Sequence, residues 1–476
     1  MRSLFINGEK VVTTQAIQNV NPSDTADVVG EYAMAGIQET QDAIAAARAA
    51  FPAWAAATPQ ARHDILLRAG NEILDRRREL ADLLAREEGK LLGEAEIEVV
   101  RAGHILQFFA GEAVRLKGET GASVRPGIYV DVTREPVGVI GLITPWNFPI
   151  AIPAWKIAPA LAYGNTVVFK PAELVPGSAW ELVDILHRAG LPPGVLNLLT
   201  GKGSVVGQAI LDDPAVDAIS FTGSQATGKR VAQASLAHMR RFQLEMGGKN
   251  PLLVLDDADL EIAVECALDG SFYSTGQRCT ASSRLIVTNS IHDRFVEMLA
   301  ERMRRLVVGD ARKPGTGMGP VVDENQLRQD TDYIEVARRQ GGTLRTGGER
   351  LRRETPGYYL SPALITNTTN DMRINREEVF GPVASVIRVR DYEEGLSVAN
   401  DTEFGLCAGI CTTSLKYASD FKQKSEAGMV MVNLPTAGVD HHVPFGGRKG
   451  SSFGPREQGA HAREFFTEIK TSYTRP

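Results

Sequence analysis

The sequence has few cysteines, four among its 476 residues, and they do not form the pairs that mark a metal or redox site. No two of them are separated by two residues, and Cys407 and Cys411 have no nearby histidine to complete a metal set. We therefore expect a protein with reduced cysteines, in the cytoplasm, without a metal ion.

The sequence also lacks a recognisable export signal or membrane span. Its first residues, MRSLFINGEKVVTT, have a charged residue on each side of an apolar run that is too short for a secretory leader. The longest stretch low in charge, residues 141–169, contains four prolines and Lys156, which argues against a lipid-spanning helix. It predicts a buried, irregular segment at a site, in a protein with no membrane partner.

An excess of one charge is absent as well. The 52 basic and 58 acidic residues are interleaved and leave a net charge of −6. No basic cluster with interleaved aromatic residues is present, so we expect no nucleic-acid partner.

The chain is long enough for two large domains, and its patterns favour an α/β fold. Apolar residues recur at helical spacing over residues 38–116. Short apolar strands such as NTVVFK and AVDAISFTG then alternate with helices, which is typical of a parallel sheet covered by helices. A second α/β series follows Cys279, and the C-terminal AREFFTEIKTSYT alternates like a strand that could pair with an edge on another subunit.

Two glycine-rich stretches are weak indications of a nucleotide site. Residues 223–230, GSQATGKR, match a phosphate-binding loop as far as the lysine, but Arg230 replaces the required Ser or Thr. Residues 201–207, GKGSVVG, have one residue too many for the dinucleotide fingerprint. We expect both to be strand-to-helix turns that present backbone N–H groups to a phosphate.

Cys279, in STGQRCTAS, is the strongest candidate for a reactive residue. A cysteine in a cytosolic enzyme is most often a small buried hydrophobe, but the polar neighbours Gln277, Arg278 and Thr280 argue against an inert core position. Arg278 would also favour the thiolate electrostatically. A thiol protease would need a histidine base, and none of the eight histidines lies in a motif that recommends it.

Seven motifs connect the chain with a known family. TPWNFP, GNTVVFKPAE, FTGS, LEMGGKNP, GQRC, EEVFGPV and PFGGRKGS occur in the order and rough spacing of the NAD(P)-dependent aldehyde dehydrogenase superfamily, which the whole chain resembles. The resemblance implies a homodimer or homotetramer with three parts. These are a Rossmann-like NAD-binding domain (1–116 and 137–246), an α/β catalytic domain (247–455) and a small β oligomerisation element (117–136 and 456–476).

The resemblance also implies catalytic roles. Cys279 would be the nucleophile, and Asn147, with the Cys279 backbone N–H, would stabilise the developing alkoxide. Glu245 matches the base that activates water for thioester hydrolysis, and its apolar neighbours suit a carboxylate with a raised pKa. Lys156 is a further catalytic candidate.

The cofactor residues implied by the resemblance are Trp146, Lys170, Glu173, Gly223, Ser224, Glu378 and Phe380. Lys170 and Glu173 would hold the adenosine ribose, and Ser224 would contact a phosphate. Glu173 would repel a 2′-phosphate, so we expect NAD, although Lys170 could partly offset the repulsion and permit NADP.

The tunnel residues implied by the resemblance are Arg101, Phe148, Trp155, Tyr273, Arg278, Thr280, Val439 and Phe445. Two arginines favour a small aldehyde that carries a carboxylate, because arginine can bind it through two parallel hydrogen bonds. The alternative, that one or both point to solvent or bind a structural acid, stays open.

The segment NLPTAGVDHHVPFGGRKGSSFGPREQG resembles the branch of the family that oxidises 2-oxoglutarate semialdehyde (2,5-dioxopentanoate) to 2-oxoglutarate. Succinate semialdehyde and other short ω-carboxylated aldehydes are alternative substrates. A coenzyme-A-acylating enzyme and a catalytically silent structural protein are less favoured alternatives. Glu245 argues against the first of these, and the joint presence of Cys279, Asn147 and Glu245 argues against the second.

Overall fold

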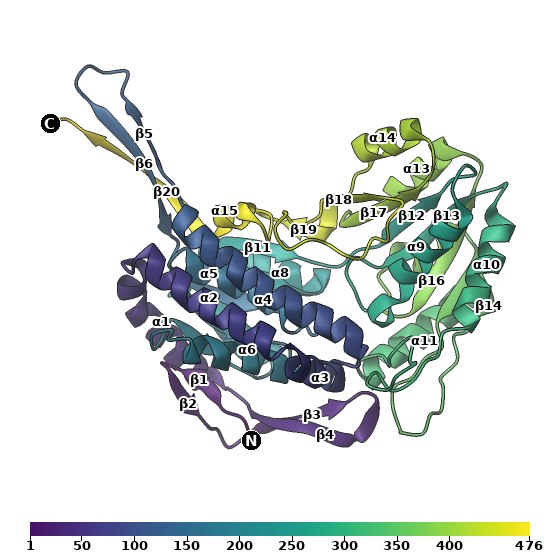
Figure 1. Cartoon of the computed structure of the whole chain (residues 1–476), viewed down its shortest axis with the longest axis horizontal. Coiled ribbons are helices and arrows are strands. Elements are labelled where there is room, and N and C mark those ends of the chain that lie inside the picture. The colour runs from purple at the N-terminus through teal and green to yellow at the C-terminus, as the bar shows by residue number, and fades with distance from the viewer.

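A computed structural model describes the whole chain, residues 1–476. An eight-stranded sheet forms the centre of its N-terminal half (Figure 1). In spatial order the strands are β19 (Ser452–Phe453), β11 (Arg241–Glu245), β10 (Ala218–Thr222), β7 (Val139–Ile143), β8 (Thr166–Lys170), β9 (Leu196–Leu198), β1 (Leu4–Ile6) and β2 (Glu9–Val11). The strands from β11 to β9 are parallel and the edge strands antiparallel, which confirms the predicted sheet type.

Helices cover both faces of this sheet. They are α1 (Ile37–Ala55), α2 (Pro59–Asp75), α3 (Arg77–Glu88), α4 (Leu92–Arg115), α5 (Ala151–Ala162), α6 (Pro176–Arg188), α7 (Gln208–Asp212) and α8 (Gln225–Ala237), with a π-helical turn η1 (Gly203–Gly207) before α7. Successive side chains of a strand point to opposite faces, so Val167 and Phe169 of β8 pack under α2, α4, α5 and α6, whereas Val168 packs under α1, α7 and α8.

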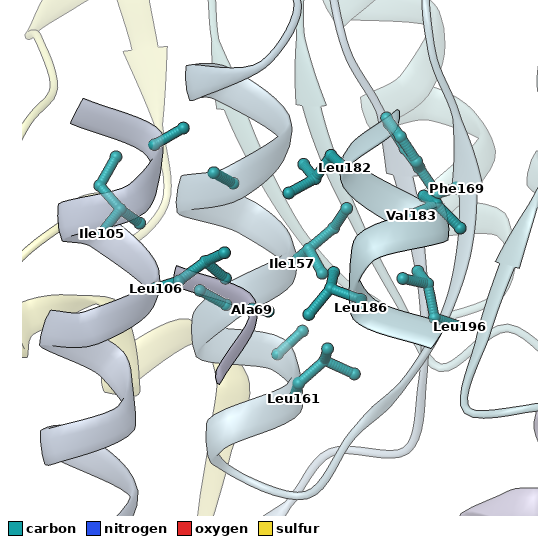
Figure 2. Close-up of a cluster of buried hydrophobic side chains, with 14 of the residues drawn as sticks. Ala69, Ile105, Leu106, Ile157, Leu161, Phe169, Leu182, Val183, Leu186 and Leu196 are labelled. Atoms are coloured by element: carbon teal, nitrogen blue, oxygen red, sulfur yellow. The ribbon is translucent and has the colours of Figure 1, made fainter. Parts of the chain in front are cut away.

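The buried side chains on the two faces of the sheet form two apolar clusters. The larger one, which contains Val167 and Phe169, joins helices that are far apart in the sequence. Figure 2 shows Leu106 of α4, Ile157 of α5 and Leu186 of α6 pointing into one apolar layer, together with Phe169 and Leu196 of the sheet. Burial of each such side chain stabilises the fold by about 1.5–3 kcal/mol. The layer therefore fixes α4 and α5 relative to each other, and both helices carry residues of the site described below.

A seven-stranded sheet forms the other half. Its order is β14 (Thr343–Thr346), β15 (Ala363–Thr368), β16 (Val383–Val389), β13 (Ser282–Thr288), β12 (Asn250–Val254), β17 (Cys407–Cys411) and β18 (Met429–Val432). Only the β14–β15 pair is antiparallel. Its helices are α9 (Leu260–Phe272), α10 (His292–Arg304), α11 (Glu324–Arg339), α12 (Arg373–Arg376), α13 (Tyr392–Asn400) and α14 (Leu415–Lys424).

A three-stranded arm stands away from both halves (Figure 1). It consists of β20 (Thr467–Thr474), β6 (Tyr129–Pro136) and β5 (Glu119–Ala122), and the short α15 (Arg463–Phe466) leads into it. Both segments that we predicted to form an oligomerisation element contribute to this arm, and their role in assembly stays a prediction.

The remaining elements are a hairpin and three short turns. A hairpin of β3 (Ala16–Asn21) and β4 (Asp24–Ala33) precedes α1, and the 3₁₀ turns η2 (Tyr273–Gly276), η3 (Lys449–Ser451) and η4 (Ala460–Ala462) lie in the second half and the C-terminal region. None of the helices combines the length and apolar character needed to cross a membrane.

Candidate active site

Two cavities meet at Cys279, which lines both of them. One has a volume of about 250 Å³ and the other of about 360 Å³. Cys279 lies between η2 and β13 of the second sheet, whereas Asn147 lies between β7 and α5, and Glu245 ends β11 of the first sheet. The candidate catalytic residues therefore come from both halves of the molecule.

The smaller cavity contains every residue that we predicted to line a substrate tunnel. These residues are Arg101, Phe148, Trp155, Tyr273, Arg278, Thr280, Val439 and Phe445. The rings of Trp155 and Phe445 lie 5.4 Å apart and form an apolar wall. Ile97 and Glu98 of α4, which were not predicted, also line this cavity.

The two arginines of this cavity have different surroundings. Arg278 donates hydrogen bonds to the carbonyl oxygens of Asp269, Gly270 and Tyr273, at 2.8, 2.8 and 3.0 Å, and so caps the end of α9. Arg101 donates one hydrogen bond, to the Gln458 side-chain oxygen at 3.0 Å, while its Nε is buried without a partner. Burial lowers the pKa of both guanidinium groups.

The larger cavity contains five of the predicted cofactor residues, Trp146, Gly223, Ser224, Glu378 and Phe380. Their placement fits a dinucleotide. Ser224 is the N-cap of α8, so the N-terminus of this 13-residue helix begins at the cavity wall, a position that suits a diphosphate.

The turn at Gly247 brings a carboxylate to the same cavity. A Cβ atom at Gly247 would lie 1.9 Å from Glu378 Oε2, so only glycine allows this approach. Glu378 Oε1 accepts the Gly248 N–H at 2.9 Å, and burial raises the pKa of Glu378 to about 7. A carboxylate fixed in this way is suited to accept hydrogen bonds from ribose hydroxyls.

Lys170 and Glu173 lie outside the lining of this cavity, beside the glycine turn that follows β9. Lys170 ends β8, and its ammonium lies 3.7 Å from Glu173 Oε1, which also accepts the Gly203 N–H at 2.7 Å. Glu173 is partly exposed. The pair lies at the carboxyl edge of the parallel strands, where open α/β sheets bind nucleotides.

The turn before Cys279 has a strained backbone. Ser274 and Thr275 have φ angles of 49° and 57°, and Gly276 has 67°. Left-handed conformations cost about 1–2 kcal/mol per non-glycine residue. Distant contacts hold the turn, because Glu94 accepts the Ser274 N–H at 2.9 Å and Thr275 donates to the Gly319 carbonyl oxygen at 3.3 Å.

The thiol of Cys279 is protonated in this arrangement. Burial raises its pKa to about 12, and the nearby carboxylates Glu378 and Glu245 act in the same direction. The Arg278 charge lowers this pKa, as the sequence suggested, but it is outweighed. The thiol must therefore lose its proton before Cys279 can act as a nucleophile.

Two hydrogen-bond donors lie beside the thiol. The Asn147 side chain is buried and donates to the Gln277 carbonyl oxygen at 3.0 Å, which leaves its second amide proton unused. The Cys279 backbone N–H makes no hydrogen bond within the protein. Both groups are therefore able to donate to an oxyanion formed at the cysteine.

Glu245 is buried near the same point. Burial and the charge of Glu457 raise its pKa well above the usual range, although Ser452 donates to its Oε2 at 2.6 Å. Neither Glu245 nor Lys156 lines either cavity. Lys156 forms a buried ion pair with Glu457 and donates to Ser220 Oγ at 2.8 Å. Lys156 therefore acts on Glu245 through its charge and through Glu457, and not through a hydrogen bond.

Sequence reasoning missed several polar residues around the site. Gln326 and Gln329 of α11 line the larger cavity and donate to the Val379 carbonyl oxygen at 3.1 and 2.8 Å. On α4, Glu94, Glu98 and Arg101 follow one another at intervals of four and three residues, which places them on one helix face. That spacing is visible in the sequence and could have identified the two glutamates.

Comparison with known proteins gives consistent matches along the whole chain. The sequence profile of the aldehyde dehydrogenase family matches residues 9–472. The chain is 44% identical to alpha-ketoglutaric semialdehyde dehydrogenase of Bacillus subtilis (strain 168), over 99% of this chain and 98% of that protein. It is also 44% identical to alpha-ketoglutarate semialdehyde dehydrogenase of Haloferax volcanii, over 98% of each chain.

A solved structure agrees with these matches. Betaine aldehyde dehydrogenase from Staphylococcus aureus, in complex with NAD+, superposes with a TM-score of 0.97 and is 34% identical in sequence. The superposition covers 100% of this chain and 95% of that one.

Proposed function

This chain belongs to the aldehyde dehydrogenase family, and from that premise we propose that it oxidises 2-oxoglutarate semialdehyde to 2-oxoglutarate with NAD. The observation that carries the substrate proposal is the cavity of about 250 Å³ beside Cys279, which holds two arginines. Neither arginine forms an ion pair with the Glu94, Glu98 or Asp269 carboxylates that line the same cavity. Two curated relatives with 44% identity are named for the same substrate.

Arg101 is the better candidate for the distal carboxylate of the substrate. Its Nε is buried without a partner, and burying an unpaired polar group is unfavourable. A substrate carboxylate would supply the missing acceptor through a charge-assisted hydrogen bond. Most donors of Arg278 are already used at the end of α9, so we assign it a supporting charge.

The first chemical step forms a bond between Cys279 Sγ and the aldehyde carbon, after the thiol has passed its proton to a water molecule. The carbonyl oxygen becomes an alkoxide, to which the Asn147 amide and the Cys279 N–H are free to donate. Loss of one such donor typically costs about 10²–10³ in rate.

NAD, when bound, supplies the acceptor for the hydride that leaves the former aldehyde carbon, and a thioester on Cys279 remains. Glu245 then removes a proton from water, whose oxygen attacks the thioester carbon, and the carbon–sulfur bond breaks to release the acid. The raised pKa of Glu245 makes its ionised form a stronger base than an exposed glutamate.

The preference for NAD rests on Glu173. Its carboxylate is positioned by the Gly203 N–H and would repel a 2′-phosphate. Lys170, at 3.7 Å, offsets only part of this charge. We therefore propose NAD as the preferred cofactor and weaker activity with NADP.

The direct test is NADH formation with a panel of aldehydes of similar size. We expect kcat/KM to be highest for 2-oxoglutarate semialdehyde, lower for succinate semialdehyde, much lower for neutral propanal and lowest for cationic betaine aldehyde. A cation preferred over a dicarboxylate semialdehyde would overturn the substrate proposal. Activity that requires coenzyme A would favour the acylating alternative, against which Glu245 argues.

We also propose that the protein works in the cytoplasm as a homodimer or homotetramer assembled through the arm of β5, β6 and β20. The outer strands of this arm have unpaired edges, and Ile469 and Tyr473 are 62% and 61% exposed. Unpaired strand edges favour association with another chain. Light scattering of the intact chain and of a Lys470→Pro variant should show loss of the oligomer in the variant.

A further inference from the structure

A buried lysine at the start of α4 contacts the segment that carries Asn147. Lys90 is 1% exposed and lies just before the helix. Its Nζ donates to Glu98 Oε2 at 2.6 Å and to the Asn147 carbonyl oxygen at 2.7 Å. It also lies 3.7 Å from the centre of the Phe148 ring. The chemical steps above give no role to this lysine.

Glu98 completes a clamp on the same segment. Its Oε2 binds Lys90, and its Oε1 accepts the N–H groups of Ile150 and Ala151, both at 3.2 Å. Together Lys90 and Glu98 bind three backbone groups of this segment, which are the Asn147 carbonyl oxygen and the N–H groups of Ile150 and Ala151. Both residues belong to α4 or the residues just before it, whose position is fixed by the apolar layer described above.

The segment depends on such outside partners because it has little regular structure of its own. Pro145 and Pro149 have no N–H group, and residues 144–148 belong to no helix or strand. No backbone N–H donates to the Asn147 carbonyl oxygen, so Lys90 is its hydrogen-bond partner. Loss of Lys90 would leave this buried oxygen unpaired and free the peptide to rotate.

We propose that Lys90 is a positioning residue for the alkoxide-stabilising site, which fixes the Asn147 peptide and thereby aims the Asn147 side-chain amide at Cys279. The inference rests on the proposed function, since it assumes that Asn147 donates to the alkoxide. Lys90 itself reaches neither the substrate nor the cofactor, because it lines neither cavity.

The charge of Lys90 is stable at this position. Burial lowers its pKa, but Glu98 and Glu88 outweigh that effect, so the net pKa is raised and the ammonium keeps all three donors at neutral pH. Glu88 is buried beside it without any hydrogen bond. Glu87→Gln is a matched control, because the buried Glu87 carboxylate binds Asn19, Gly177 and Ser178 and hydrogen-bonds neither to Lys90 nor to the Asn147 segment.

The test is a double-mutant cycle of Lys90→Met and Asn147→Ala, measured as kcat/KM for the aldehyde. Lys90→Met alone should lower this value about tenfold, less than the loss of the donor itself. In the Asn147→Ala background it should lower the value less than twofold, because the group that it positions is gone. KM for NAD and the rate of Cys279 alkylation by iodoacetamide should be unchanged by Lys90→Met.

Glu98→Gln provides a second variant. Its amide oxygen can still accept the N–H groups of Ile150 and Ala151, whereas the ion pair with Lys90 is lost. This variant should show a smaller loss that also disappears in the Asn147→Ala background. An equal loss in both backgrounds, a parallel loss of alkylation rate, or an equal loss in Glu87→Gln would overturn the inference. If Asn147→Ala alone has no effect, the proposed alkoxide site fails, and that result is distinguishable from failure of the Lys90 role.

Discussion

Arg101→Ala should change the substrate preference of this enzyme more than its overall activity. In the smaller cavity, Arg101 has a buried Nε without a partner and a single hydrogen bond, to Gln458. A charge-assisted hydrogen bond contributes about 1.5–3 kcal/mol. Since about 1.4 kcal/mol corresponds to a factor of ten, kcat/KM for 2-oxoglutarate semialdehyde should fall about 10- to 150-fold.

Propanal, which has no carboxylate, separates charge recognition from cavity shape. Its kcat/KM should change less than about threefold in Arg101→Ala, the size of an ordinary surface substitution. Arg115→Ala is the matched control, because Arg115 lies at the exposed far end of α4 and pairs with Glu112. The assay is initial NADH formation with both aldehydes for the three proteins. Equal losses of kcat/KM for the two aldehydes would show that Arg101 shapes the cavity through its packing on Trp155 and does not bind the substrate carboxylate.

Three further outcomes follow from the site. Arg278→Ala should lower the free energy of unfolding by about 2–4 kcal/mol in urea titrations, since three carbonyl oxygens lose a charged donor. An unchanged midpoint would contradict this. Glu245→Gln should slow turnover about 10²–10⁴-fold, because hydrolysis of the thioester needs this base. Stopped flow should still show a burst of roughly one NADH per subunit, since the steps up to the thioester do not need it. Loss of the burst would show that Glu245 acts in a step before the thioester forms. Burial raises the pKa of Glu378 from 4.5 to about 7, so between these pH values the folded protein holds a proton that the unfolded chain has released. The free energy of unfolding should therefore decrease as pH rises through this window, by up to about 3 kcal/mol, and Glu378→Gln should flatten that decrease.

The parts of the structure that depend on local pattern could be predicted from the sequence. Helical periodicity over residues 38–116 corresponds to α1 through α4, and the apolar runs correspond to the strands of two parallel sheets. The eight tunnel residues that the family resemblance selected are all among the 17 residues that line the smaller cavity. In each case the information lies within a few neighbouring residues.

Contacts between distant segments could not be predicted. Lys90 and Asn147 are 57 positions apart, and Lys156 and Glu457 are 301 apart, so no window of sequence reveals that these groups meet. Arg278 was expected to act on the thiolate or on a substrate. The left-handed turn at Ser274 and Thr275 instead directs most of its donors to carbonyl oxygens at the end of α9. The net pKa of Cys279 depends likewise on burial and on carboxylates from other segments.

The left-handed turn at Ser274 and Thr275 has a consequence for how the enzyme acquires activity during folding. Such a turn is unfavourable in an isolated chain, and its supports come from Glu94 and Gly319, which are 180 and 44 positions away. The turn can form only after α4 and the segment before α11 have docked. Cys279 therefore remains an ordinary thiol through synthesis and early folding, and it becomes a catalyst only when the two halves of the molecule are complete.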